Sequence, residues 1–305
     1  MNLKDKINRI EELKKEKNAV IMAHYYVDGE VQGVADYLGD SYYLSHAATT
    51  IDKNIIVLCG VKFMGESAKA LNPEKKILLP ASEAECPMAH MATVESIREV
   101  REKYEDVAVV CYVNSTAELK AESDVCVTSA NALNIVSKLP NKNIFFIPDK
   151  NLATYISKKL PDKNFIFNKG CCYIHDRITK EQVALAKELH PDAKLLVHPE
   201  CKSDIADIAD YVGSTSEIIR YVKESSDNEF IIATEEGVLF ELNNVAPEKQ
   251  FYTVTKEQIC PGMKMVSLDN IIEVLENESS QIEMDRELID KAKIPMEKML
   301  ELAKK

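Results

Sequence analysis

Short apolar runs alternate with amphipathic stretches along most of the chain. Apolar side chains recur at helical spacing in two stretches, at Leu3, Ile7, Ile10 and Leu13 and again at Val94, Ile97, Val100 and Tyr104. This spacing predicts helices with one buried face. Thr179 followed by Gln182 predicts a capping box that opens another helix. Between the helices, apolar runs such as 19–24 and 107–114 predict strands.

The same features occur three times in the same order, with a period of about 87 residues. An apolar strand that ends in polar residues opens each unit, at 19–24, 107–114 and 193–200. His24, Tyr112 and His198 in these strands are 88 and then 86 residues apart. An aspartate motif follows each strand, and its members repeat both spacings: Asp36, Asp124 and Asp210.

Each unit then continues with a second apolar strand and a third strand that leads into a cysteine. The second strands begin near residues 54, 143 and 229. Cys86, Cys172 and Cys260 follow the third strands, 86 and then 88 residues apart. Each unit therefore reads helix–strand–helix–strand–helix–strand, a pattern typical of a parallel α/β sheet.

The repeat predicts three α/β domains related by a pseudo-threefold axis, each with a small, mainly parallel sheet between helices. The expected boundaries are 1–88, 89–174 and 175–266. Residues 267–305 begin another helix that no strand follows, so we expect this segment to pack back on the first domain.

Charge and composition narrow the class of protein. The formal net charge of −12 argues against a nucleic-acid partner. No apolar run reaches the roughly 20 residues that a membrane helix needs, so no membrane association is expected. Residues 1–17 are charged and amphipathic, unlike a signal peptide, so we expect a cytoplasmic protein. Disulfides are not expected among its eight cysteines in that compartment.

The three repeated cysteines predict a metal centre. A pseudo-threefold axis would bring Cys86, Cys172 and Cys260 to one point at the carboxyl ends of the strands. Three thiolates could hold either zinc or a [4Fe–4S] cluster with one open iron, and spacing does not choose between them. Cys171 competes with Cys172, which fits the repeat better. We expect Cys59, Cys111 and Cys126 to be core residues, whereas the role of Cys201 stays open.

Polar residues just past the first strand of each unit should face the same central space. They are His24, Tyr26, Tyr112, Asn114, His198 and Glu200. Satisfied structural residues are the alternative for the two histidines, but their equivalent positions favour function. A carboxylate such as Glu200 beside a metal could act as a general base. Ser41, Ser129, Ser214 and Thr215 lie at expected helix starts, where they could cap the helices or bind anionic groups.

With these residues in view, the chain resembles the quinolinate synthase family over essentially its whole length. The matching stretches are AHYY (23–26), LGDS (38–41), GVKFMGE (60–66), LNPEKK (71–76), CPMAH (86–90), YVNSTAELK (112–120), TSANA (128–132), HPEC (198–201), VGSTSE (212–217) and CPGMK (260–264). Two positions depart from the family pattern. The middle motif reads Cys171-Cys172-Tyr173 where one cysteine and a proline are usual, and the last motif has a single cysteine.

The resemblance implies condensation of iminoaspartate with dihydroxyacetone phosphate to quinolinate, with loss of phosphate and two waters, for NAD biosynthesis. It also implies one [4Fe–4S] cluster on Cys86, Cys172 and Cys260, whose open iron acts as a Lewis acid. Substrate contacts would fall on His24, Ser41, Tyr112, Asn114, Ser129, His198, Glu200 and Thr215, with Tyr26 in the active site. Transient contacts with an aspartate-oxidising enzyme and with cluster-assembly proteins are expected. Two alternatives stay open: another [4Fe–4S] hydro-lyase, and a zinc-containing binding protein without catalytic activity.

Overall fold

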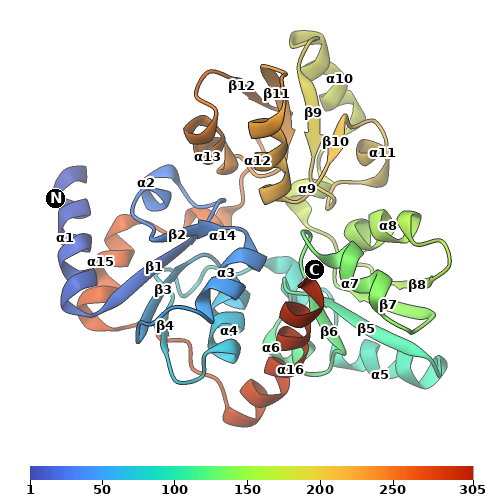
Figure 1. Ribbon diagram of the computed structural model, residues 1–305, viewed down its shortest axis with the longest axis horizontal. Helices are drawn as coiled ribbons and strands as arrows, with labels where there is room; N and C mark the ends of the chain where they lie inside the picture. The colour runs from blue at the N-terminus through green and yellow to red at the C-terminus, as the bar shows by residue number, and fades with distance from the viewer. Residues whose placement is uncertain (305) are drawn as a thin grey trace.

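We describe residues 1–304 of the chain from a computed structural model. Three four-stranded parallel sheets, each flanked by helices, surround a common centre (Figure 1). The predicted α/β class with three small parallel sheets is therefore confirmed. We call the parts that carry these sheets the first, second and third units, in chain order.

The first unit contains β1 (Ala19–His24), β2 (Tyr37–Gly39), β3 (Ile55–Cys59) and β4 (Lys76–Leu78). Its helices are α1 (Leu3–Glu16), α2 (Gly29–Gln32), α3 (Ser41–Ala48), α4 (Lys62–Leu71) and the 3₁₀ turn η1 (Pro87–His90). Of the apolar face predicted for α1, Ile10 and Leu13 are buried, whereas Leu3 and Ile7 are exposed.

The second unit contains β5 (Val107–Tyr112), β6 (Val125–Val127), β7 (Asn143–Ile147) and β8 (Asn164–Phe167). Its helices are α5 (Val94–Lys103), α6 (Ala117–Ala121), α7 (Ala132–Lys138), α8 (Lys150–Lys159) and α9 (Tyr173–Asp176).

The third unit contains β9 (Lys194–Val197), β10 (Tyr211–Val212), β11 (Glu229–Ala233) and β12 (Gln250–Thr253). Its helices are α10 (Lys180–Leu189), α11 (Ser203–Ala206), α12 (Thr215–Glu224), α13 (Val238–Val245) and α14 (Pro261–Lys264). The capping box predicted at Thr179 and Gln182 is confirmed at the start of α10. All three sheets share one strand order, in which the first strand lies between the second and the third.

The aspartate motifs, where we predicted only helix starts, also form the short edge strands β2, β6 and β10. The repeated aspartates explain why these edge strands form, because each carboxylate accepts a backbone N–H of the neighbouring central strand. Asp36 binds Ile21 at 2.8 Å, and Asp124 and Asp210 bind Val109 and Leu195, each at 2.7 Å. Each aspartate side chain thereby attaches a short edge strand to the central strand of its sheet.

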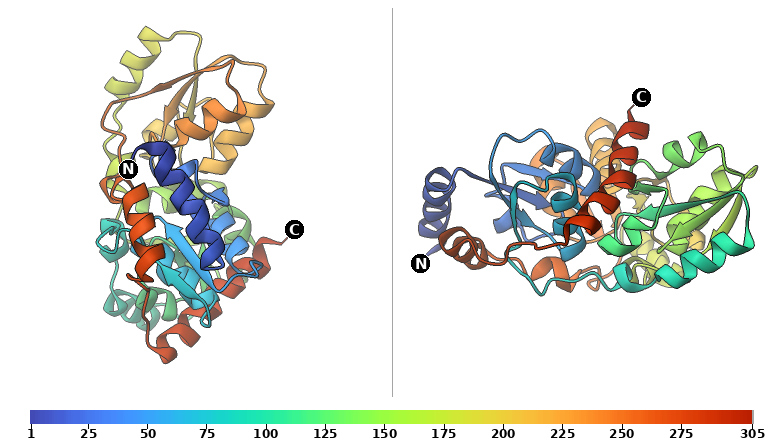
Figure 2. Two further views of the ribbon diagram at one scale, coloured as in Figure 1. Left: turned by 90° about the vertical axis from the view of Figure 1, so that its left-hand side faces the viewer. Right: turned by 90° about the horizontal axis from the view of Figure 1, so that it is seen from below.

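Two C-terminal helices follow the third unit, α15 (Leu268–Asn277) and α16 (Arg286–Ala303). Helix α15 packs beside α1 on the first unit. Helix α16 contacts α4 of the first unit and also α6, β6 and α7 of the second. Figure 2 shows α16, in red, crossing between these two units. The end of the chain therefore joins the first two units directly.

Candidate active site

One cavity is lined by residues that follow the carboxyl ends of strands in all three sheets. Twelve of the sequence-predicted residues line it: His24, Tyr26, Ser41, Cys86, Tyr112, Asn114, Ser129, Cys172, His198, Glu200, Thr215 and Cys260. Ser214 lies just outside, where its side chain caps α12 by accepting the N–H of Glu217. The parallel strands of three separate sheets thus deliver their terminal side chains to one space.

The helix starts differ in detail from their predicted pattern. Helix α3 begins at Ser41, but its cap is Asp40, which accepts the N–H of Tyr43 at 2.9 Å. Ser129 lies in a turn, and α7 begins three residues later, after Asn131. Because the serines at 41 and 129 do not serve as caps, their side chains are available to face the cavity.

Contacts between the three cysteine loops show that the loops converge. A Cβ at Gly262, next to the Cys260 loop, would lie 2.7 Å from the carbonyl oxygen of Glu85, so only glycine fits there. On the other side, the N–H of Cys171 points at the Met91 sulfur at 3.5 Å. Each loop therefore touches a neighbouring loop, which keeps the three sulfurs around one cavity.

Burial strongly affects the thiols in this cavity. It raises the pKa of Cys86 to about 12, with a further contribution from Cys260, and it raises the pKa of Cys172 and Cys260 as well. Three protonated thiols facing each other stabilise one another little, whereas a bound cation would stabilise them as thiolates. Among the other cysteines, Cys59, Cys111, Cys126 and Cys201 are buried in the core, and Cys171 is partly exposed outside the cavity lining.

Glu200 is the buried carboxylate of the site, with 3% of its surface exposed. Burial by itself would raise its pKa, but the His175 imidazole at 2.7 Å, with help from His198 and Tyr112, lowers the pKa to about 2. The carboxylate is therefore ionised near neutral pH, in a space that excludes most water. Such a group can accept a proton from a bound molecule.

His24 and His198 occupy equivalent places and have equivalent surroundings. Burial lowers the pKa of both rings to about 3, so both are neutral near pH 7. The Nδ1 of His24 accepts the N–H of Tyr26 at 3.2 Å, and the Nδ1 of His198 accepts the N–H of Glu200 at 3.3 Å. Each neutral ring therefore carries its proton on Nε2 and can donate it to a ligand oxygen.

A continuous chain of hydrogen bonds joins Tyr26 to Glu200 through residues of all three units. The Tyr26 hydroxyl lies 2.7 Å from Thr215 Oγ1 and 2.8 Å from Thr234 Oγ1. Thr234 Oγ1 lies 2.8 Å from His175 Nε2, and His175 Nδ1 lies 2.7 Å from Glu200. A chain of this kind can pass a proton between a tyrosine hydroxyl and a carboxylate without the intervention of bulk water.

Two buried polar atoms of the cavity lining have no hydrogen-bond partner among residues 1–304. They are Asn114 Oδ1 and Thr128 Oγ1. Leaving a buried polar atom unpaired costs about 1–3 kcal/mol. A polar ligand in the cavity would satisfy both atoms.

Comparisons with known proteins agree with this site. The family model described as quinolinate synthetase A protein matches residues 8–301. The chain belongs to this family. It is 52% identical over 296 residues to a quinolinate synthase of Fusobacterium nucleatum subsp. nucleatum, covering 97% of this chain and 99% of the relative. A quinolinate synthase of Caldicellulosiruptor bescii is 47% identical over 302 residues, covering 99% of this chain and all of the relative. This member of the quinolinate synthetase A family is therefore an enzyme.

Family membership implies a metal cofactor, and the residues of the cavity fit one. Cys86, Cys172 and Cys260 are soft sulfur donors that share one enclosed space. Donor atoms of Cys172, His175 and Glu200 also lie within 4.8 Å of one another. The site therefore offers three thiols from three units, with an imidazole and a carboxylate beside them.

Among residues 1–304, no helix is both long and apolar enough to cross a membrane.

Sequence reasoning missed several residues that line this cavity: Asp40, Thr128, His175 and Glu235. His175 follows Cys172 by three residues, so its place on the short helix after a repeated cysteine was an available signal. Glu235 comes directly after the strand and Thr234, in a position that the repeat also defines. Asp40 and Thr128 carried no comparable signal, because polar residues at helix starts are usually caps.

Proposed function

We propose that this enzyme condenses iminoaspartate with dihydroxyacetone phosphate to quinolinate, releasing phosphate and two waters, in NAD biosynthesis. The supporting observation is the cavity in which one cysteine from each unit lies beside a buried carboxylate and two neutral imidazoles. The similar proteins from Fusobacterium nucleatum and Caldicellulosiruptor bescii are quinolinate synthases, which supports quinolinate as the product. The two substrates follow from the family resemblance.

In this proposal Cys86, Cys172 and Cys260 hold a [4Fe–4S] cluster. One iron without a protein ligand would supply Lewis-acid chemistry to a substrate oxygen. The rest of the site belongs to the chain itself. Two carboxylates and a phosphate must be held in place, and holding both substrates in line contributes several kcal/mol to a condensation.

Polar groups of all three units would bind these anions. Ser41 and Ser129 would donate their hydroxyl protons to carboxylate or phosphate oxygens. His24 and His198 would do the same from Nε2, because their Nδ1 atoms already accept backbone N–H groups. The amide of Asn114, whose oxygen has no partner among the described residues, would orient a substrate hydroxyl or imine. Neutral donors suit this task, since they need no counter-charge in a buried cavity.

Glu200 would accept the protons released during enolisation, dehydration and ring closure. Its carboxylate is ionised in the free enzyme. Through His175 and Thr234, a proton taken up near Tyr26 could reach the same carboxylate. Tyr112, whose side chain hydrogen-bonds Glu200, would add a second hydroxyl beside this carboxylate.

Anaerobic purification followed by iron, sulfide and zinc determination, paired with a quinolinate assay, tests the proposal. We expect about four irons and four sulfides per chain, together with quinolinate formation from both substrates. A protein that dehydrates simple hydroxy acids but forms no quinolinate would be a different hydro-lyase. The group of Cys172, His175 and Glu200 is the observation that favours zinc, and an iron-free, zinc-loaded protein would refute the cluster.

A further inference from the structure

Three equivalent positions directly follow the strands β3, β7 and β11. Each position lies two residues past the end of its strand. The residues are Val61, Asp149 and Glu235, separated by 88 and then 86 residues. These are the spacings of the whole repeat. Two of the three positions therefore carry a carboxylate, and the first carries an apolar side chain.

A backbone hydrogen bond beside these positions is common to all three units. The N–H groups of Lys62, Lys150 and Glu236 donate to the carbonyl groups of Ala84, Gly170 and Gln258, at 2.9, 2.8 and 2.8 Å. Each accepting residue lies two positions before the repeated cysteine. The three loops therefore start from the same attachment, and any difference between them comes from side chains.

Asp149 adds a second attachment in the second unit. The side chain is fully buried. Its Oδ2 accepts the N–H of Cys172 at 2.9 Å, and its Oδ1 accepts the N–H of Leu152 at 2.7 Å, which caps α8. One carboxylate thus connects the start of a helix to the backbone of the cysteine.

Glu235 does the same in the third unit, with 1% of its surface exposed. Its Oε1 accepts the N–H of Cys260 at 3.0 Å, and its Oε2 accepts the N–H of Gly237 at 2.6 Å. Lys264 pairs with this carboxylate at 3.1 Å and donates to the carbonyl oxygen of Tyr26 at 2.9 Å. Within residues 1–304, no side chain accepts the N–H of Cys86, where Val61 takes the equivalent position.

We propose that Asp149 and Glu235 are positioning residues that fix Cys172 and Cys260 for metal binding, whereas among the described residues no carboxylate holds the backbone N–H of Cys86. This inference rests on the cluster of the proposed function. A buried carboxylate that accepts the N–H of a ligand residue sets the direction of its sulfur, and such outer partners typically affect metal affinity by about 10–100-fold. Glu235 also connects Cys260, through Lys264, to the backbone of the Tyr26 segment.

The test measures iron release from the anaerobic holoenzyme to an excess of a ferrous chelator. We expect Asp149→Ser and Glu235→Ala to release iron about 10–100-fold faster than the unchanged enzyme. Serine at 149 can still cap α8 but cannot also reach Cys172. Both carboxylate oxygens accept a backbone N–H, whereas an amide has one acceptor oxygen. Asp149→Asn and Glu235→Gln should therefore release iron at rates between those of the unchanged enzyme and of Asp149→Ser and Glu235→Ala.

Matched controls come from the edge-strand aspartates of the same units. Asp124→Ala and Asp210→Ala each remove a carboxylate that accepts a backbone N–H at 2.7 Å, but away from the cavity. They should leave iron release unchanged. Equal release rates in the Asp149 and Glu235 variants and in these controls would overturn the positioning role while leaving the cluster in place. If Glu235→Ala does not fold, the iron-release rates of Glu235→Gln and Asp149→Ser decide whether the two carboxylates position the cysteines. If the enzyme without substitutions contains no iron and no sulfide after anaerobic purification, both proposals are wrong.

Discussion

The first two units are packed against each other differently from the third. One continuous apolar core runs through the first and second units and includes Met296 and Met299 of α16. The third unit instead has a separate core on each face of its sheet, one around Leu195 and Ile231 and the other around Leu196 and Phe230. Apolar burial therefore joins two of the three repeats, although the repeats share one topology.

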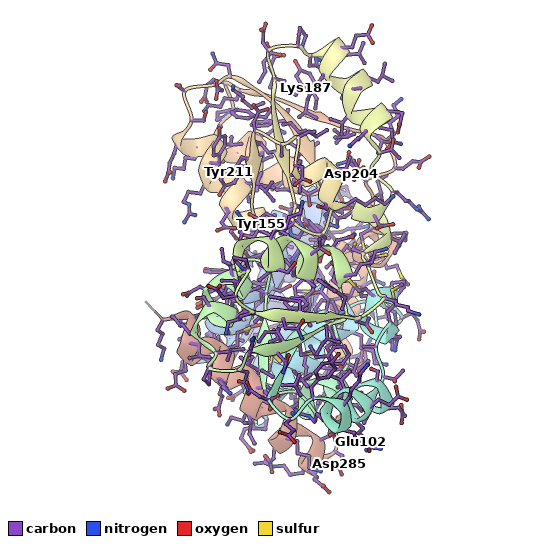
Figure 3. The ribbon with its side chains drawn as sticks, turned by 90° about the vertical axis from the view of Figure 1, so that its right-hand side faces the viewer. Glu102, Tyr155, Lys187, Asp204, Tyr211 and Asp285 are labelled. Carbon is purple, nitrogen blue, oxygen red and sulfur yellow. The ribbon has the colours of Figure 1, made fainter. Side chains whose placement is uncertain are left out.

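Several polar contacts connect the third unit to the other two. Ser216 donates to Asp40 at 2.5 Å, Asn151 donates to the carbonyl oxygen of Glu200 at 3.0 Å, and Tyr26 meets two threonines. Figure 3 shows the third unit above the second, with Tyr155 and Tyr211 near their boundary. The cavity lies where the third unit meets the other two. The polar chemistry of the site and the polar contacts between units therefore occupy the same surface.

The largest expected effect tests whether the third unit is needed to complete the metal centre. Replacing Cys260 by alanine should abolish both cluster and activity, as should the same change at Cys86 or Cys172, because each unit supplies one ligand. Iron analysis and the quinolinate assay measure this. Cys59→Ala is the control, since that thiol is fully buried in the core of the first unit. A Cys260→Ala enzyme with full iron content would show that the first two units hold the metal alone.

The second prediction tests whether the third unit supplies the proton-accepting group. Glu200→Gln should keep the cluster and lower kcat by about 10²–10⁴-fold, because the amide cannot accept a proton. Steady-state kinetics together with iron content separate the two effects. Glu224→Gln, an exposed change at the end of α12, should have no effect. Full turnover in the Glu200 variant would remove this residue from the mechanism.

The third prediction tests the shared core directly. Met299→Ala should lower the free energy of unfolding by about 2–5 kcal/mol, and it should loosen the first and second units together. Leu242→Ala should loosen the third unit alone, since Leu242 belongs to a core of that unit. Alkylation of buried thiols, read by peptide mass spectrometry, reports on each unit through Cys59, Cys126 and Cys201. If both variants accelerated the alkylation of all three thiols equally, the division between a core shared by the first two units and separate cores in the third would be wrong.

The smallest effect is expected at the polar boundary. Ser216→Ala removes the hydrogen bond to Asp40 and should cost about 1 kcal/mol. It should speed amide hydrogen exchange in α12 and around α3, on both sides of the boundary. Ser225→Ala is the matched control, because its hydroxyl donates to Asp227 at 2.9 Å within the third unit. Faster exchange on one side only would mean that Ser216 does not join the units.

Much of the fold was predictable because it rests on local and periodic patterns. The spacing of His24, Tyr112 and His198 gave the repeat, and the apolar runs around them gave the central strands. The edge strands β2, β6 and β10 were not predicted, because they are two or three residues long and depend on a carboxylate bond to the next strand. Such a bond forms only after the sheet brings both partners together.

The sequence alone determined which residues reach the centre of the molecule, since parallel strands of equal topology must present their carboxyl ends in equivalent ways. It determined the three repeated cysteines and most of the polar cavity lining. The tertiary structure alone decided the partners of those residues: the link from Tyr26 through Thr234 and His175 to Glu200, and the carboxylates behind Cys172 and Cys260. These contacts join residues that are far apart in the chain, and no periodic pattern encodes the distance between them.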